Sequence, residues 1–223
     1  MISRETLQFL ADLAENNNRD WFMANKKRYE AYKKEYLDVV TAVLDVLKTK
    51  DETLKLLEPK KCMFRINRDI RFSLDKSPYK THMGMWFSDA RASGGNAPGY
   101  YIQIDPKQSF IAAGFHNPES AELKKIRKEI AFFNDELDAV LKDKKFKAVF
   151  ADLDRNNALK TAPKDFEKDH PAIENLKLKS FTVTGNLSKT DISDKDFAKK
   201  TAEKLAVAKP LNEFLKRALN VED

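Results

Sequence analysis

Apolar residues recur at helical spacing at both ends of the chain. The pattern predicts a helix over residues 3–16, with Ser3 as its N-terminal cap. A stripe of tyrosine, valine and leucine residues predicts a long helix from about Arg19 to Lys48. The same spacing predicts later helices over residues 119–141, 144–151, 194–208 and 210–219.

A different pattern, with apolar residues in alternation or in short runs, occupies the middle of the chain. It predicts strands over about residues 62–72, 83–89, 99–105 and 109–115, and "FTVTGNL" at Phe181–Leu187 is a further candidate. The loop composition of "ASGGNAP" at 92–98 and the tight turn "DPKQ" at Asp105–Gln108 separate consecutive strands. Short connections indicate antiparallel pairing. We therefore expect an α+β fold, with an antiparallel sheet of about four to five strands flanked by N-terminal and C-terminal helices.

The composition is that of a water-soluble globular protein. The chain has 223 residues, of which 42% are hydrophobic and 34% charged. Its single cysteine, Cys62, excludes an intramolecular disulfide bond. No segment approaches the roughly 18 consecutive apolar residues that cross a bilayer, and the N-terminal segment lacks the apolar core of a signal peptide. We expect a cytoplasmic protein without a membrane partner.

Positive charge is concentrated in one part of the chain. The whole sequence carries a formal net charge of +6, and residues 60–82 contain seven basic and two acidic residues. Nearly all of the excess therefore lies in this one segment. A focused cluster of this kind is what a binding site for an anion requires.

The segment "RINRDIRFSLDKSPYKTH", from Arg65 to His82, combines arginines with apolar residues. In an extended strand Arg65 and Arg71 would share one face, opposite the apolar side chains. Their planar guanidinium groups suit carboxylate or phosphate. Arg68 falls in the apolar phase, so we expect either a bulge that re-orients it or a buried ion pair with a carboxylate.

The end of this segment predicts a second anion-binding element. Ser77 is a favoured N-cap and Pro78 fits a first helical position, so a short helical turn is expected there. Its free N–H groups would point toward an anion. The candidate ligand-binding residues are Arg65, Arg68, Arg71, Lys76, Ser77, Tyr79, Lys80 and His116.

A second interpretation of the same residues is purely structural. The arginines would pair with Asp69, Asp75 or more distant carboxylates and only fix the turn. The residue types favour neither interpretation over the other.

Four blocks of the sequence form a recognisable set: "NNNRDWFMANKKRY", "RINRDIRFSLDKSPYKTH", "GYYIQIDP" and "LKTAPKDFEKDHPAIENLKLKSF". Together they resemble a bacterial and fungal family known as domain of unknown function 2461. They span nearly the whole chain, so the resemblance implies one domain over residues 1–223. It also implies that the segment from Arg65 to Lys80 is the central signature of the family. The resemblance implies no particular activity.

Other chemistry is weakly indicated. The three histidines show no zinc-ligand spacing, so no metal site is expected. A glycine-rich phosphate loop, a dinucleotide fingerprint and a nucleophile elbow are all missing from the sequence, so no cofactor is expected. His116 follows a predicted strand, where it could line a pocket and act as a general acid or base. An enzymatic role therefore stays open.

The leading functional hypothesis is the binding of a small anionic ligand, such as a phosphorylated one, at the Arg65–Lys80 segment. The main alternative is a nucleic-acid-binding module, in which aromatic residues form a stacking surface on the sheet. The residues considered for that surface are Tyr79, Trp86, Tyr100 and Tyr101. A third hypothesis is a protein-interaction domain with internally paired arginines.

Overall fold

The computed structural model describes residues 1–90 and 95–220. The N-terminal region contains α1 (Arg4–Glu15), α2 (Arg19–Ala24) and α3 (Lys26–Lys50). Ser3 caps α1 as predicted, since its hydroxyl accepts a hydrogen bond from the Thr6 amide. The single helix expected over residues 19–48 is wrong in one respect, because Asn25 separates α2 from α3. The Asn25 side chain donates to the Trp21 carbonyl, and such local hydrogen bonds compete with the helix.

The sheet has the order β1-β2-β3-β4, and all of its pairs are antiparallel. Its strands are β1 (Met83–Phe87), β2 (Gly99–Ile104), β3 (Ser109–Phe115) and β4 (Phe181–Leu187). The predicted α+β class and antiparallel sheet are confirmed, and "FTVTGNL" is the fourth strand. Part of the loop expected at residues 92–98 lies outside the described residues.

The strand predicted over residues 62–72 is wrong. The chain forms the short helix α4 (Pro59–Cys62) and then an irregular loop up to β1. Only isolated bridges occur in this loop, Met63 with Met85 and Asn67 with Tyr79. The alternation of apolar residues misled the prediction because they do not share a buried face: Phe72 is 96% exposed.

Four later helices agree with the predicted ranges to within a few residues: α6 (Ser120–Lys142), α7 (Lys144–Val149), α10 (Phe197–Ala206) and α11 (Lys209–Leu219). Three short helices have no counterpart among the predicted ranges: η1 (Glu52–Leu54), α8 (Ile173–Leu176) and α9 (Lys189–Ser193). Within residues 1–90 and 95–220, none of the helices combines the length and apolar character that crossing a bilayer requires.

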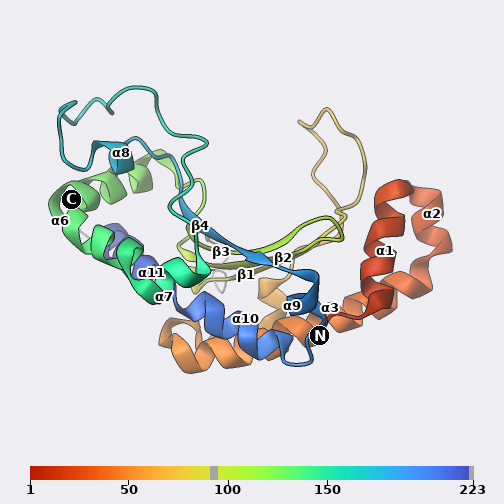
Figure 1. The fold of residues 1–223 in the computed structure, drawn as a ribbon. Coiled ribbons are helices and arrows are strands. Elements are labelled where there is room, and N and C mark those ends of the chain that lie inside the picture. Colours follow the sequence, from red (N-terminus) through yellow and green to blue (C-terminus); the bar gives the residue numbers. More distant parts are fainter. Residues whose placement is uncertain (91–94, 221–223) are drawn as a thin grey trace.

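Only one face of the sheet is covered by helices. Figure 1 shows α3 and α10 beneath the sheet, while the opposite face lies open between α1 and the loop before β1 on one side and α8 on the other. The side chains of Met85, Ile102 and Val183 point to the helices and are fully buried. Trp86 and Tyr101, which lie opposite each other on β1 and β2, occupy the open face and are partly exposed.

One buried hydroxyl joins α3, the sheet and the loop before β1. The Tyr36 hydroxyl donates a hydrogen bond to the Gly84 carbonyl and accepts one from the Phe64 amide. Phe64 is thereby fixed beside β1, at the edge of the open face. This contact sets where the loop leaves the sheet.

Candidate functional site

We call residues 63–82 the basic loop. Its two limbs are tied together by backbone hydrogen bonds from Arg68 to Pro78 and from Lys80 to Ile66. Asn17, which follows α1, holds the loop from outside: its side chain accepts from the Tyr79 amide at 3.0 Å and donates to the Tyr79 carbonyl at 2.9 Å.

The helical turn predicted at Ser77 does not form. Ser77 and Pro78 lie in irregular backbone. The amides of Tyr79 and Lys80, which were expected to face an anion, donate to Asn17 and Ile66 instead. The Tyr79 ring is buried and stacked on Phe22, with 4.1 Å between ring centroids. The backbone of Tyr79 is therefore held by a long-range contact with Asn17, and Ser77 does not cap a helix.

Two of the arginines pair with carboxylates of the loop itself. Arg68 contacts Asp75 at 2.5 Å and also donates to the Ser77 carbonyl at 3.0 Å. Arg71 makes a bidentate pair with Asp69, at 2.7 and 3.0 Å. For Arg68, pairing with a carboxylate was one of the two expected outcomes, and the side chain is 26% exposed.

The pKa of the Asp75 carboxyl is lowered by its neighbours in the loop. Hydrogen bonds from Ser77 and from the Arg68 guanidinium lower the pKa of the Asp75 carboxyl to about 2. Asp75 is therefore ionised throughout the neutral range, and it compensates Arg68 alone.

Lys80 is a cation without a carboxylate partner in the described part of the chain. Its ammonium donates to the carbonyls of Arg65 at 2.6 Å and of Asn67 at 2.9 Å. Burial, together with the positive charges of Arg65 and Arg68, lowers the pKa of Lys80. An ammonium has three N–H donors, so these two bonds leave one for another acceptor.

A cavity of about 530 Å³ opens beside the loop, and we call it the basic cavity. Its cationic lining residues are Arg68 and Lys80 from the loop and Lys107 from the β2–β3 turn. His82 also lines it, and burial together with the nearby Lys80 charge lowers the pKa of its imidazole, although Asp105 opposes the effect. The remaining polar lining residues are Asn17, Asp69, Asp75, Ser77, Tyr79 and Thr81.

The structure brings together only some of the predicted site residues. Arg68, Ser77, Tyr79 and Lys80 line the basic cavity, whereas the remaining predicted residues are not among its lining residues: Arg65, Arg71, Lys76 and His116. Because no strand forms, Arg65 and Arg71 do not share a strand face. The Lys76 ammonium donates to the Ile70 carbonyl at 3.0 Å.

Sequence reasoning missed Asn17, His82 and Lys107 as lining residues of this cavity. Asn17 follows α1, and Lys107 lies in the predicted turn Asp105–Gln108. Both are far from the basic loop in sequence, so no local signal links them to it. For Asn17, the block that it shares with the resembled family was the only available hint.

A second cavity, of about 560 Å³, lies on the open face of the sheet, and we call it the sheet groove. Aromatic side chains from the strands and from the basic loop surround it: Phe64, Trp86, Tyr101 and Phe110. His116 and Asp154 stand among its lining residues. Burial raises the pKa of Tyr101 to about 12, so its hydroxyl stays protonated and donates to Gln103 at 3.0 Å.

The aromatic surface expected for nucleic acid is only partly present. Trp86 and Tyr101 lie on the open face, but Tyr100 points to the helices, where its hydroxyl donates to Asp51 at 2.8 Å. Tyr79 is buried against Phe22. Trp86 and Tyr101 line the sheet groove together with Phe64 and Phe110.

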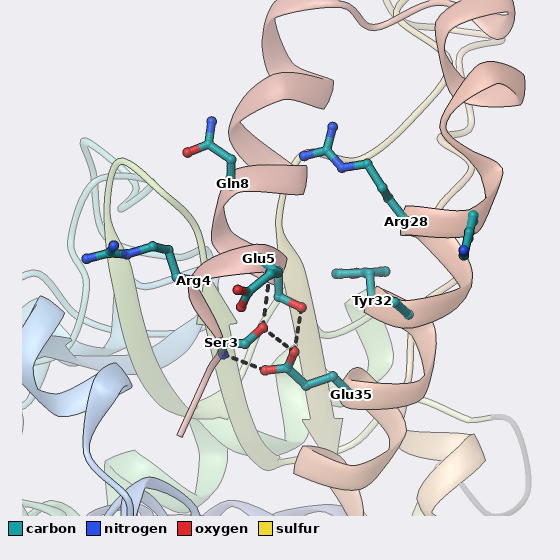
Figure 2. A pocket seen from close by; sticks show the side chains of 10 residues that line it. Ser3, Arg4, Glu5, Gln8, Arg28, Tyr32 and Glu35 are labelled. Carbon is teal, nitrogen blue, oxygen red and sulfur yellow. Dashed lines mark hydrogen bonds between the residues drawn. The ribbon is translucent and has the colours of Figure 1, made fainter.

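A third hollow, of about 640 Å³, lies between α1 and α3 and has a structural role. Figure 2 shows Glu35 pointing from α3 to the start of α1. Its carboxylate accepts from the Ser3 amide at 2.6 Å, the Ser3 hydroxyl at 2.5 Å and the Thr6 hydroxyl at 2.7 Å. Arg28, on the same wall, pairs with Asp12 at 2.7 Å. These polar groups hold α1 on α3.

Comparison with known proteins identifies one family. The family described as Conserved hypothetical protein (DUF2461) matches residues 5–214. No curated protein and no solved structure matches the chain.

Proposed function

The chain belongs to the DUF2461 family, and we propose that it binds a small anionic ligand, with a phosphate or carboxylate group, in the basic cavity. One observation carries the proposal: the cations of the cavity are only partly compensated. Asp75 pairs with Arg68, and Asp69 pairs with Arg71. These two carboxylates leave Lys80 and Lys107 without an ion-pair partner in the described part of the chain.

The neighbourhood of Lys80 supports the same proposal. Burial lowers the pKa of Lys80, and the positive charges of Arg65 and Arg68 lower it further, so positive potential accumulates at its ammonium. An anion would relieve this repulsion and accept the third N–H of Lys80. Ser77 and Lys107 would supply further donors. The exposed Arg65 would contribute attraction over longer distances, which salt screens.

Thermal shift assays test the proposal at constant ionic strength. The ligands are inorganic phosphate and a panel of phosphorylated and carboxylated metabolites. A ligand at a hundred times its Kd stabilises the fold by about 2.7 kcal/mol, which raises the Tm of a chain of this size by roughly 5–10 °C. We expect the increase to disappear in Lys107→Ala and in Lys80→Met.

A matched variant serves as the control for Lys80→Met. Lys60→Met removes an exposed lysine of α4, outside the basic cavity. It should keep the response to the ligand. Lys107→Ala changes an exposed turn residue, so it separates loss of binding from loss of folding. An unchanged response in Lys107→Ala would overturn the proposal.

The same assays distinguish the alternatives. Oligonucleotides that bind with strong salt dependence, while no small anion does, would favour a nucleic-acid-binding module. If nothing binds and Arg68→Gln lowers the Tm, the paired arginines serve the fold and the protein-interaction hypothesis gains.

A further inference from the structure

We propose that the sheet groove is a second binding site, which takes a flat heterocyclic ring with N–H donors, such as an amino-substituted nucleobase. The proposal goes beyond anion binding, because the groove is a separate cavity with different lining residues and the opposite charge. It rests on the floor of the groove, on its aromatic rings and on one carboxylate.

The floor of the groove is the sheet itself. Gly99 lies opposite Gly114, and Ala112 lies between Tyr101 and Thr184 in the register. Gly99 and Gly114 are buried, whereas the small Ala112 side chain is only partly buried and leaves room above the middle of the sheet. A flat ligand can therefore approach the sheet closely, which a bulky side chain at Ala112 would prevent.

Two aromatic rings extend across the sheet because glycines make room for them. A Cβ atom on Gly99 would lie 2.8 Å from the indole nitrogen of Trp86, and one on Gly84 would lie 2.8 Å from the Tyr101 hydroxyl. Each ring thus covers the glycine of a neighbouring strand. Rings that lie along a sheet in this way present a face to the groove, and a flat heterocycle stacks on such a face.

The polar groups of the groove select the kind of ring. Asp154 is exposed and provides the only carboxylate among the described lining residues, none of which is a lysine or arginine. Its Oδ1 accepts from the Asn156 amide at 2.9 Å, so acceptor capacity remains for a ligand. A carboxylate attracts N–H donors and repels phosphates. His116, Thr182 and Thr184 can hydrogen-bond other edge atoms.

The position of Asp154 is fixed by the sheet. Its amide donates to the Thr182 carbonyl at 2.8 Å, and the Ala151 amide donates to the Thr184 carbonyl at 2.9 Å. The segment before α8 therefore runs along the free edge of β4. This pairing holds the carboxylate at the rim of the groove.

The size of the groove favours a nucleoside over a nucleic-acid strand. Its volume of about 560 Å³ is in the usual range for small-molecule sites. A strand would also require cations along its phosphates, and the described lining residues supply none. The occupant we infer is a single amino-bearing base or nucleoside.

Tryptophan fluorescence provides a direct test. The chain has two tryptophans, so Trp21→Phe leaves Trp86 in the groove as the reporter. In this background adenosine, cytidine and guanosine are titrated, with ribose alone as the control ligand. We expect saturable quenching by at least one nucleoside and none by ribose. Absence of saturable quenching by all three nucleosides overturns the proposal.

Variants locate the site. Asp154→Asn should weaken nucleoside binding about tenfold, since hydrogen bonds to a charged group are the stronger ones. Asp152→Asn, an exposed neighbour outside the groove, should leave it unchanged. Ala112→Leu should abolish binding by filling the floor. Thr184→Arg, at an exposed position, should do the same while keeping the fold.

The test of nucleoside binding in the groove does not depend on anion binding in the basic cavity. Lys107→Ala and added phosphate should leave nucleoside quenching unchanged, so either proposal can fail alone. Binding that survives both Ala112→Leu and Thr184→Arg overturns the assignment to the groove. Salt-dependent quenching by oligonucleotides, without quenching by nucleosides, overturns it as well.

Discussion

The basic cavity and the sheet groove are similar in size, but they are built in different ways. The walls of the basic cavity are loop side chains, joined by hydrogen bonds between residues far apart in sequence, such as Asn17 and Tyr79. The groove owes its floor to strand alternation and to small residues on β2 and β3. One site depends on side-chain contacts of an exposed loop, and the other depends on the backbone of the sheet.

The difference predicts different resistance to change. Segments with few buried apolar contacts open at lower free energy than the strands of a sheet. We expect the shape of the basic cavity to respond to single substitutions and to pH, whereas the shape of the groove should change only when the sheet does. The two sites also differ in charge. The basic cavity is lined by Arg68, Lys80 and Lys107, whereas the described lining residues of the groove include no lysine or arginine.

The largest loss of stability is expected for Gly114→Ala, which changes the floor of the groove. Gly114 has a φ of 109°, and a Cβ atom there would lie 1.9 Å from the Phe181 carbonyl oxygen. Backbone strain and this clash should cost about 3 kcal/mol or more, which lowers the Tm by roughly 6–12 °C. Differential scanning calorimetry measures the change.

Ala112→Ser is the control for this substitution, since it alters a neighbouring open-face position without changing the backbone. Its Tm should stay close to that of the parent protein. A Gly114→Ala protein as stable as Ala112→Ser would show that the floor of the groove is less constrained than we infer.

Tyr36→Phe should have an intermediate effect and should separate the two regions. It removes the hydroxyl that joins Gly84 to Phe64 and leaves the buried Gly84 carbonyl and the half-buried Phe64 amide without this partner. A cost of roughly 1–3 kcal/mol is expected. Amide hydrogen exchange should quicken in the basic loop, starting at Phe64, more than in β2 and β3.

The matched control is Tyr29→Phe, which alters a half-buried tyrosine of the same helix. It should leave exchange in the loop unchanged. Equal acceleration in the loop and in the central strands after Tyr36→Phe would contradict the separation of the two regions.

A smaller effect, limited to the basic cavity, is expected from pH. The pKa of His82 is lowered from 6.5 in the fold by burial and by Lys80. As pH falls below 6.5, the unfolded chain takes up a proton before the folded protein does. The free energy of unfolding should therefore decrease until pH passes the lowered folded pKa. Urea unfolding between pH 8 and pH 5 measures this slope.

His82→Gln should flatten the slope, because it removes the imidazole whose pKa the fold lowers. Phosphate bound in the basic cavity should raise the pKa of His82, which NMR titration of the imidazole would detect. If phosphate binds but the pKa of His82 stays unchanged, the anion occupies another place.

The smallest effect is expected for Arg71→Gln. The pair of Arg71 with Asp69 is bidentate, but the arginine side chain is 75% exposed. Exposed pairs contribute little, so the Tm should change by less than about 2 °C. A larger loss, measured by thermal unfolding, would show that the loop depends on this pair.

The sequence by itself determined most of the longer helices, the four strands and the concentration of charge, but it also predicted a strand over residues 62–72 that does not form. Helical and strand spacing are local properties, and in β2, β3 and β4 the alternation corresponds to one buried and one open face. The charge of residues 60–82 was likewise available from composition. The predicted residues Arg68, Ser77 and Lys80 do line a cavity.

Only the tertiary structure decided how these parts became sites. The arginine segment had the alternation of a strand, but Asn17, Ile66 and Pro78 hold it as a loop through contacts that no local pattern contains. Arg71 pairs with Asp69 and is not among the lining residues of the basic cavity, whereas the β2–β3 turn contributes Lys107 to it. Side-chain hydrogen bonds and packing act between distant residues, whereas periodicity reports only on neighbours along the chain.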